Sequence, residues 1–321
     1  MGNWENENPQ MQAAQTGRTG YGLDPREMRR RCNRVGIALI ACMAAVNLFG
    51  LGLTYALPLS LLDSDLVLML VNDFSYYVVG GLVLWLILRP LPSRTPEGEV
   101  VPFPRFLKWF FEDIGLTYSV AFLTMFLIWV IFEKLLGLTL ANSVDSLSTM
   151  SLPILVIFSV IVAPICEEFL FRKLLLERLL PMGESFSIVV SSVAFGLFHQ
   201  NLYQLFFATA AGMLYAVMAI KTGDVRCPMI MHAITNVLSV VSNVIDAESD
   251  AATWYVLALL FLMVIGLGYV TRDIRDIRSG KWVITTSPAV PGNWHAALTS
   301  PGMITCVVIL VVLSLVMGLF G

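Results

Sequence analysis

Long apolar runs recur along the whole chain, and no other feature constrains its fold as strongly. A helix needs about 20 predominantly apolar residues to cross a bilayer. The chain is 57% hydrophobic and 13% charged, with a mean hydropathy of +0.77, whereas soluble domains carry about 25% charged residues. These values predict an all-α fold, a polytopic bundle of eight to nine transmembrane helices. The candidate spans, of which the fifth is short, are 35–57, 66–88, 114–133, 152–171, 185–200, 203–220, 228–245, 252–270 and 303–320.

The distribution of basic residues predicts how these spans are oriented. Cytoplasmic loops of membrane proteins are enriched in Lys and Arg. With a cytoplasmic N-terminus, nine spans place nineteen of the twenty Lys and Arg residues on the cytoplasmic side, and Lys134 is the exception. We therefore expect an integral, multi-pass protein of the cell membrane whose N-terminus is cytoplasmic and whose C-terminus lies outside.

The polar stretches between the spans suggest four parts. The segment FPRFLKWFFE at 103–112 mixes basic and aromatic side chains, which is typical of a helix lying in the cytoplasmic interface. The polar N-terminal residues have a composition typical of disorder. We expect a disordered cytoplasmic segment, two accessory spans with the interfacial helix, a core that holds the polar residues discussed next, and a last part with the eighth span, a cytoplasmic loop and the ninth span: 1–34, 35–114, 115–245 and 246–321.

Two adjacent carboxylates, Glu167 and Glu168, interrupt the span 152–171. An ionisable group inside a membrane is costly, and it therefore marks a candidate functional site. Glu168 and Arg172 are spaced i, i+4 with the acid first, which is the favourable order for a pair on one helix face. Glu167 points ~100° away around the helix. We interpret Glu168–Arg172 as a structural pair and Glu167 as a candidate general base, just beyond a distortion caused by Pro164.

Three more polar residues are predicted to reach the same level. Glu167 and His199 are equally far in sequence from Gly183, so an antiparallel hairpin that turns there would place both at similar height, provided that the fourth span extends further into the cytoplasm. On the seventh span, His232 and Asn236 are one turn apart, about one and two turns from its cytoplasmic edge. We expect the four side chains to meet at one level that faces the cytoplasm.

A structural role is the main alternative for these residues. Asn and His side chains often form hydrogen bonds between transmembrane helices. For a single histidine we would favour that role, but two acids, an arginine, two histidines and an amide at compatible depth favour chemistry. Asp73 in the second span is interpreted as structural or as a partner of Tyr76 and Tyr77. Cys166 points away from the side of Glu167 and is not expected to be a nucleophile.

Three short motifs follow one another along these spans. They are two glutamates, three residues and an arginine; a phenylalanine, three residues and a histidine; and a histidine, three residues and an asparagine. In this chain they are Glu167-Glu168 with Arg172, Phe195 with His199, and His232 with Asn236. In these motifs the chain resembles the CAAX prenyl protease and bacteriocin-processing (CPBP, Abi-type) family of intramembrane endopeptidases. The resemblance covers residues 115–245, the predicted core.

The resemblance implies hydrolysis of a peptide bond of a membrane-associated protein or peptide near the cytoplasmic face. It implies that Glu167 and His199 activate a water, that His232 and Asn236 hold the oxyanion, and that Glu168 and Arg172 orient the site. The expected partners are this substrate and the lipid bilayer, and no nucleic acid is expected.

A metal-dependent version of the same reaction is the competing mechanism. Glu167, His199 and His232 could hold Zn²⁺ with a water in the fourth position. Because the chain lacks the HExxH arrangement in this region, we favour a mechanism without a cofactor.

Two other functions remain as alternatives. A catalytically silent member of the family could act as an immunity or regulatory partner in the membrane, although the complete motifs argue against this. An ion-coupled transporter could use Glu167, Glu168 and Asp73, but such proteins usually show inverted repeats, and we find none in the sequence.

Overall fold

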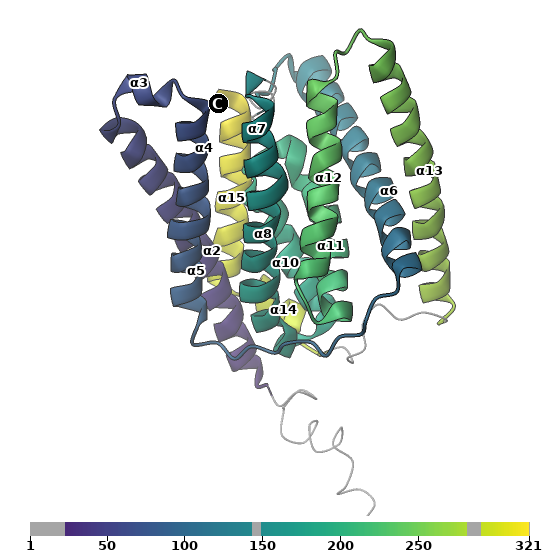
Figure 1. Ribbon diagram of the computed structural model, residues 1–321. Coiled ribbons are helices and arrows are strands. Elements are labelled where there is room, and N and C mark those ends of the chain that lie inside the picture. The colour runs from purple at the N-terminus through teal and green to yellow at the C-terminus, as the bar shows by residue number, and fades with distance from the viewer. Residues whose placement is uncertain (1–22, 143–148, 281–289, 321) are drawn as a thin grey trace, which may run out of the picture.

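The computed structural model describes residues 23–142, 149–280 and 290–320, and these residues form helices without any strand. Eight helices or continuous helical runs are long and apolar enough to cross a membrane. This confirms an all-α, multi-span helical bundle (Figure 1). The eight are α2 (Pro25–Ala56), α4–η2–α5 (Asp65–Leu88), α6–η3 (Phe103–Leu136), α7 to η7 (Leu152–Met182), α11 (Leu202–Thr222), α12 (Arg226–Val244), α13 (Asp250–Arg278) and α15 (Pro301–Phe320).

The fifth predicted span, 185–200, is a shorter helix, α10 (Glu184–Phe198), of 15 residues. At 1.5 Å per residue it is about 22 Å long, too short to cross the hydrocarbon core unaided. The fourth span continues to Met182, and Gly183 turns the chain with a φ of 106°, a conformation open to glycine. The predicted hairpin is therefore confirmed. Two short helices, α3 (Leu59–Leu62) and α14 (Asn293–Leu298), lie outside the spans.

The N-terminal boundary differs from the prediction. Residues 25–34 belong to α2, although the sequence suggested disorder up to residue 34. The Asp24 side chain caps the helix by accepting a hydrogen bond from the Arg26 backbone N–H at 2.9 Å, and Pro25 suits the first turn. Burial of Met28 then ties this polar start to the bundle. The expectations for residues 1–22 and 281–289 lie outside the described residues.

The segment 103–112 also differs, because it continues without a break into α6 (Phe103–Ile128). α6 packs against α13 and α11, and the α6–α13 contact depends on two glycines. A Cβ on Gly115 would lie 2.5 Å from the backbone carbonyl carbon of Gly266. Small residues allow such close helix contacts in membranes.

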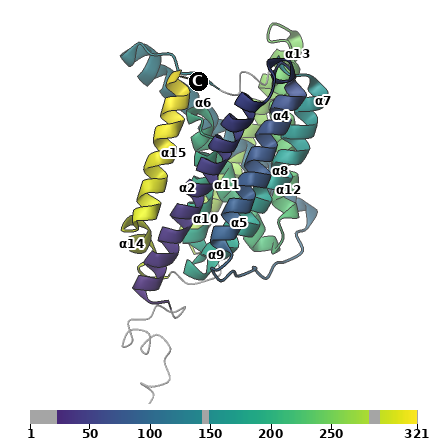
Figure 2. The same ribbon diagram turned by 90° about the vertical axis from the view of Figure 1, so that its left-hand side faces the viewer.

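The second and fourth spans lie side by side with α2 and α15 at one side of the bundle (Figure 2). α2 packs against α15, α5 (Gly81–Leu88) and the π-helical segment η2 (Phe74–Gly80), while α10 packs against α11. The C-terminus lies at the same end of the bundle as α3 and the start of α7, and the start of α2 lies at the opposite end (Figure 1).

The fourth span is distorted around the two glutamates. α8 (Ala163–Glu168) is a short α-helical stretch between two π-helical segments, η5 (Val156–Val162) and η6 (Phe169–Leu176). Pro164 has no N–H for the carbonyls of the preceding turn, and π-helical turns are frequent at functional sites. The distortion predicted from Pro164 is present, and it extends to both sides of the glutamates.

Candidate active site

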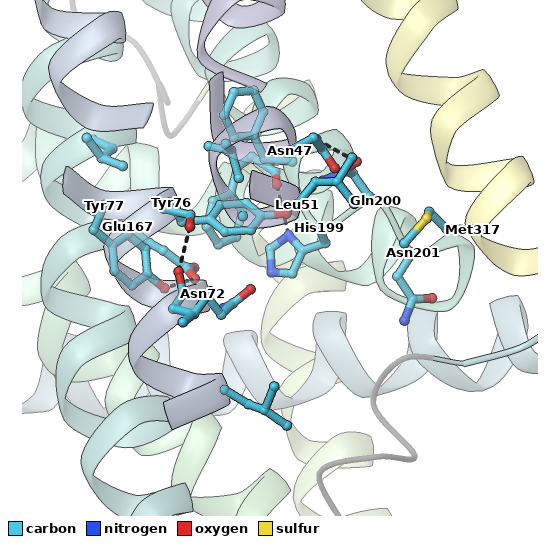
Figure 3. Close-up of a pocket in the computed structure, with 18 of the residues that line it drawn as sticks. Asn47, Leu51, Asn72, Tyr76, Tyr77, Glu167, His199, Gln200, Asn201 and Met317 are labelled. Carbon is cyan, nitrogen blue, oxygen red and sulfur yellow. Dashed lines mark hydrogen bonds between the residues drawn. The ribbon is translucent and has the colours of Figure 1, made fainter. Parts of the chain in front are cut away.

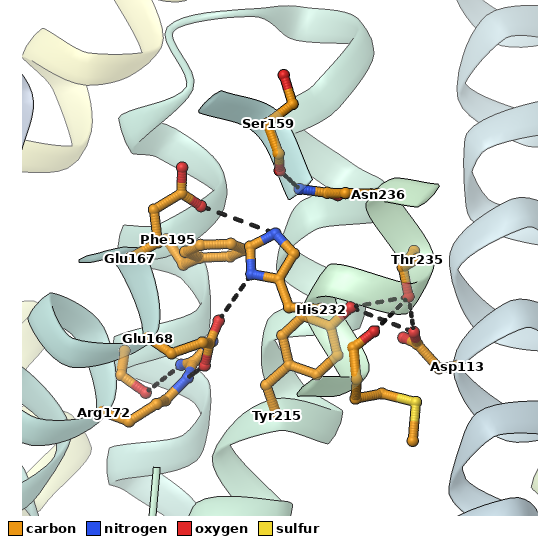
Figure 4. Close-up of polar contacts among 12 residues, drawn as sticks. Asp113, Ser159, Glu167, Glu168, Arg172, Phe195, Tyr215, His232, Thr235 and Asn236 are labelled. Atoms are coloured by element: carbon orange, nitrogen blue, oxygen red, sulfur yellow. Dashed lines mark hydrogen bonds and ion pairs between the residues drawn. The ribbon is translucent and has the colours of Figure 1, made fainter. Parts of the chain in front are cut away.

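Glu168 and Arg172 form a fully buried ion pair. Arg172 Nε donates to Glu168 Oε2 at 2.9 Å, and both side chains are 0% exposed. A third group joins them, because His232 Nδ1 lies 3.2 Å from Glu168 Oε1 (Figure 4). A buried charge is stable only with partners, and these contacts account for a fixed Glu168. The predicted structural pair is present.

Glu167 faces the other side of the helix. Its side chain is 19% exposed, and Tyr77 Oη donates to Glu167 Oε1 at 3.0 Å. His232 Nε2 lies 3.9 Å from Glu167 Oε2. The imidazole of His232 therefore lies between the two glutamates, with one nitrogen toward each. Because Glu168 accepts at Nδ1, Nε2 is a second donor only in the imidazolium form.

A buried cluster holds the ring of His232 in place. The Tyr215 ring stacks on it with centroids 5.3 Å apart, and the edge of Phe195 meets it at 5.8 Å. Tyr215 Oη in turn donates to Asp113 Oδ2 at 3.2 Å, and Thr235 also bonds to this carboxylate. Sequence reasoning missed Asp113 and Tyr215. An acid in an apolar segment with Thr117 at i+4, which donates to Asp113 at 3.2 Å, was the available signal.

His199 lies just after the end of α10 and is fixed by its own helix. Its Nδ1 is 2.9 Å from the Phe195 carbonyl oxygen. A carbonyl only accepts, so Nδ1 carries the proton and Nε2 is left as an acceptor. The Phe195 ring lies edge-on to His199 with centroids 5.1 Å apart, in agreement with the packing role predicted for this phenylalanine.

Asn236 lies on the same helix as His232 but makes a different contact. Its side-chain N–H donates to the Ser159 carbonyl oxygen of η5 at 2.7 Å (Figure 4). Ser159 is in the turn before Pro164, where carbonyls lack the usual N–H partner. Asn236 thus ties α12 to the distorted part of the fourth span, and it is not among the described residues that line the cavity beside Glu167.

Glu167 and His199 line one cavity of about 880 Å³ (Figure 3). Its floor is strained, since Gln200 has a φ of 48° without being glycine. Gln200 Nε2 donates to Tyr76 Oη at 2.7 Å, and Asn47 Nδ2 donates to Gln200 Oε1 at 3.3 Å. Backbone strain of this kind persists only where the surroundings enforce it. These two contacts hold the residue that follows His199.

The metal-binding alternative has less support in this geometry. Among residues 23–142, 149–280 and 290–320, no group of three or more His, Cys, Asp and Glu side chains is arranged to hold a metal ion. Glu167 and His232 approach each other, but His199 does not complete a ligand set with them. The described side chains are thus not arranged as a Zn²⁺ site in this structure, and the cofactor-free mechanism stays a prediction.

Asp73 in α4 (Asp65–Asp73) accepts from Asn72 Nδ2 at 3.2 Å, and among the described residues it forms no hydrogen bond with either tyrosine of η2. Within the described residues, its second carboxylate oxygen is buried without a hydrogen-bond partner. Asp73 is not one of the described residues that line the cavity, and we keep its interpretation as a structural residue.

Comparison with known proteins agrees with the motifs. Residues 149–238 match a family model described as "Type II CAAX prenyl endopeptidase Rce1-like". A "Putative membrane peptidase YdiL" of Bacillus subtilis (strain 168) is 34% identical over 92 residues, which are 28% of this chain and 38% of that protein. The chain thus spans well under two thirds of that relative. No solved structure matches. Residues 149–238, which carry all three motifs, are thus similar to the Rce1-like CAAX prenyl endopeptidases, and the resemblance inferred from the sequence is confirmed over this part of the chain.

Proposed function

We propose that the protein is an intramembrane endopeptidase that hydrolyses a peptide bond of a membrane-associated protein or peptide. This proposal rests mainly on one observation: Glu167 and His199 line the same cavity, and His232 lies between Glu167 and Glu168. A carboxylate held in a largely apolar site and an imidazole with a free acceptor nitrogen are suited to activate a water.

The proposed reaction is a direct attack of water on the substrate carbonyl. Glu167, aided by His199 Nε2, removes a proton from the water as its oxygen bonds to the carbonyl carbon. The oxyanion that forms accepts from His232 Nε2–H of the imidazolium, and donors fixed in a dry site stabilise such charge strongly. The proton held by Glu167 then passes to the leaving nitrogen as the C–N bond breaks.

Asn236 is the second proposed oxyanion donor. Its amide has two N–H groups, and one of them is bonded to Ser159. The other would have to reach the substrate. Glu168 and Arg172 act through His232, which they hold in one orientation.

The chain is an integral multi-pass membrane protein. We propose that it lies in the cell membrane with a cytoplasmic N-terminus, on the basis of its Lys and Arg distribution. The sequence also placed the site near the cytoplasmic face, and this remains a prediction. A tag at either terminus, probed for protease access in intact cells and in opened cells, tests the orientation.

The test of the activity is cleavage of a membrane-peptide library by the purified protein in lipid. Glu167→Gln is compared with the wild type and with Glu133→Gln, which changes an exposed glutamate on η3 (Trp129–Leu136) that does not line the cavity. We expect cleavage by the wild type and Glu133→Gln and none by Glu167→Gln. Folded wild-type protein that cleaves nothing would instead favour the silent binding-partner function.

A further inference from the structure

The cavity at Glu167 has two walls of different origin. The wall with Glu167, Phe195 and His199 belongs to the segment that matches the family model. The opposite wall comes from α2, α4, η2, α15 and residues 141–142, none of which lies in that segment. Whatever the cavity holds is therefore also contacted by parts of the chain that carry no family motif.

Of the proposed catalytic groups, Glu167 and His199 line the cavity, whereas His232 and Asn236 are not among the described lining residues. Glu167 is the acid of this cavity, and no Lys or Arg is among the described lining residues. Amides and hydroxyls are frequent instead, and side-chain amides both donate and accept, as a peptide backbone requires. The polar lining residues on the far wall and floor are Asn47, Thr54, Asn72, Ser75, Tyr76, Asn142, Gln200 and Asn201.

From Glu167 the cavity extends toward the end of the bundle that lies opposite the start of α2. Thr54 is near the end of α2, Leu68 near the start of α4, and Met317 near the end of α15, and these ends lie together with the C-terminus (Figure 1). Apolar side chains at this mouth are exposed, with Leu51 at 54%, Leu68 at 42% and Met317 at 48%. An apolar rim over a polar floor suits a segment that arrives from the bilayer.

We infer that this cavity is the substrate cleft, and that it binds an uncharged internal segment of a membrane-anchored chain. This segment enters from the bilayer at the end of the bundle that bears the C-terminus, the predicted outer end, and not from the cytoplasmic side that the sequence suggested. This inference rests on the proposed function, and it makes the accessory helices α2, α4 and α15 the walls that select the substrate. A cavity of this volume is in the range of about 300–1,000 Å³ in which ligands are enclosed, enough for a short stretch of peptide.

The lining also disfavours a free C-terminal carboxylate in the cleft. A carboxylate bound there would have no Lys or Arg partner among the described lining residues and would lie in one low-dielectric space with Glu167. Buried charges require a partner. An internal segment brings only backbone amides and uncharged side chains, and the amides of the cleft can pair with them.

The first test uses two glycines on one helix. Gly50 lines the cleft, and a Cβ there would meet Ser75 Oγ at 3.6 Å, an ordinary contact. Gly52 is on the same helix, and a Cβ on it meets nothing within 4 Å. Gly50→Leu should fill the cleft and lower kcat/KM by about tenfold or more, whereas Gly52→Leu, with the same gain in helix propensity, should leave it unchanged.

The second test needs no catalysis. A photo-crosslinking amino acid replaces Leu68, which lines the cleft, or Leu66, which is exposed outside it, each in the Glu167→Gln background. The probes are two membrane-anchored peptide libraries with the same random uncharged segment. In one the segment ends in a free carboxylate, and in the other it continues into a polar tail.

We expect stronger crosslinking at position 68 than at position 66, and a preference for the library with the tail in both crosslinking and cleavage. Equal crosslinking at the two positions, or unchanged cleavage by Gly50→Leu, would overturn the cleft assignment while leaving the protease activity intact. A preference for the free carboxylate would overturn the substrate class. Selective crosslinking at position 68 without cleavage by any wild-type sample would support the cleft and contradict the proposed function.

Discussion

The two adjacent glutamates should fail in different ways when each is changed to glutamine. Glu168 is 0% exposed and contacts both Arg172 and His232. Removing one partner of a buried pair leaves the other charge uncompensated, at a cost of about 3–5 kcal/mol. Arg172 could not recover this elsewhere, because its next polar contact among the described residues is Ser191 Oγ at 3.5 Å. We expect Glu168→Gln to lower the free energy of unfolding by that amount.

Glu167→Gln should lower stability less than Glu168→Gln. The glutamine side-chain oxygen can still accept from Tyr77 Oη, so a hydrogen bond to a charged acceptor, worth about 1.5–3 kcal/mol, is replaced by a neutral one worth about 1 kcal/mol. Its loss of cleavage should thus come without a loss of fold. Unfolding is followed by heat or denaturant in one detergent for both variants and the wild type.

A double variant provides the control. In Glu168→Gln with Arg172→Met the charge left by the first change is removed, and uncharged replacements of a buried pair are often close to neutral. The double variant should therefore be more stable than Glu168→Gln alone, a coupling that a double-mutant cycle measures directly. Glu168→Gln as stable as the wild type, or a double variant no better than the single one, would refute the reasoning that the pair is structural.

Three further predictions concern the contacts of Glu167 and His232 and the need for a metal. Tyr77→Phe removes a hydrogen bond to a charged acceptor, worth about 1.5–3 kcal/mol, and should lower kcat by about tenfold or more in steady-state kinetics; an unchanged kcat would show that Tyr77 does not position Glu167. Tyr215→Leu removes the stacking on His232 and should lower cleavage more than Tyr215→Phe, which keeps the ring; the reverse order would point to the Asp113 hydrogen bond instead. A chelator should leave cleavage unchanged, whereas loss in chelator with recovery in Zn²⁺ would establish the metal mechanism.

The sequence predicted those parts of the molecule that depend on local pattern. Apolar runs predicted the spans, the i, i+4 spacing predicted the Glu168–Arg172 pair, and the turn at Gly183 predicted the hairpin. Each follows from helix geometry within one segment or from a single turn. The early start of α2 was missed because its first turns are polar and are stabilised by burial of a few side chains, such as Met28, against distant segments.

The rest of the site depends on contacts between segments far apart in the chain. Tyr77 is 90 residues from Glu167, and Asp113 is 102 residues from Tyr215. No spacing rule relates such positions, and each residue alone has an ordinary structural role as its more frequent explanation. Asn236 is a further example. Its spacing predicted a position one helical turn from His232, but its hydrogen bond to Ser159 depends on the distorted fourth span that packs beside α12.

Because of these contacts, different parts of the chain supply the motif residues and the side chains that position them. The motif residues lie in the segment that matches the family model. The hydroxyl that donates to Glu167 belongs to Tyr77 of η2, and the side chains that contact Gln200 come from η2 and α2. The same helices form the far wall of the cleft. A change in α2 or η2 can therefore alter substrate choice and the position of Glu167 together. Because the motifs and these walls lie in separate stretches of sequence, the walls can differ between relatives while the chemistry is kept, and the motifs alone do not define what the cleft accepts.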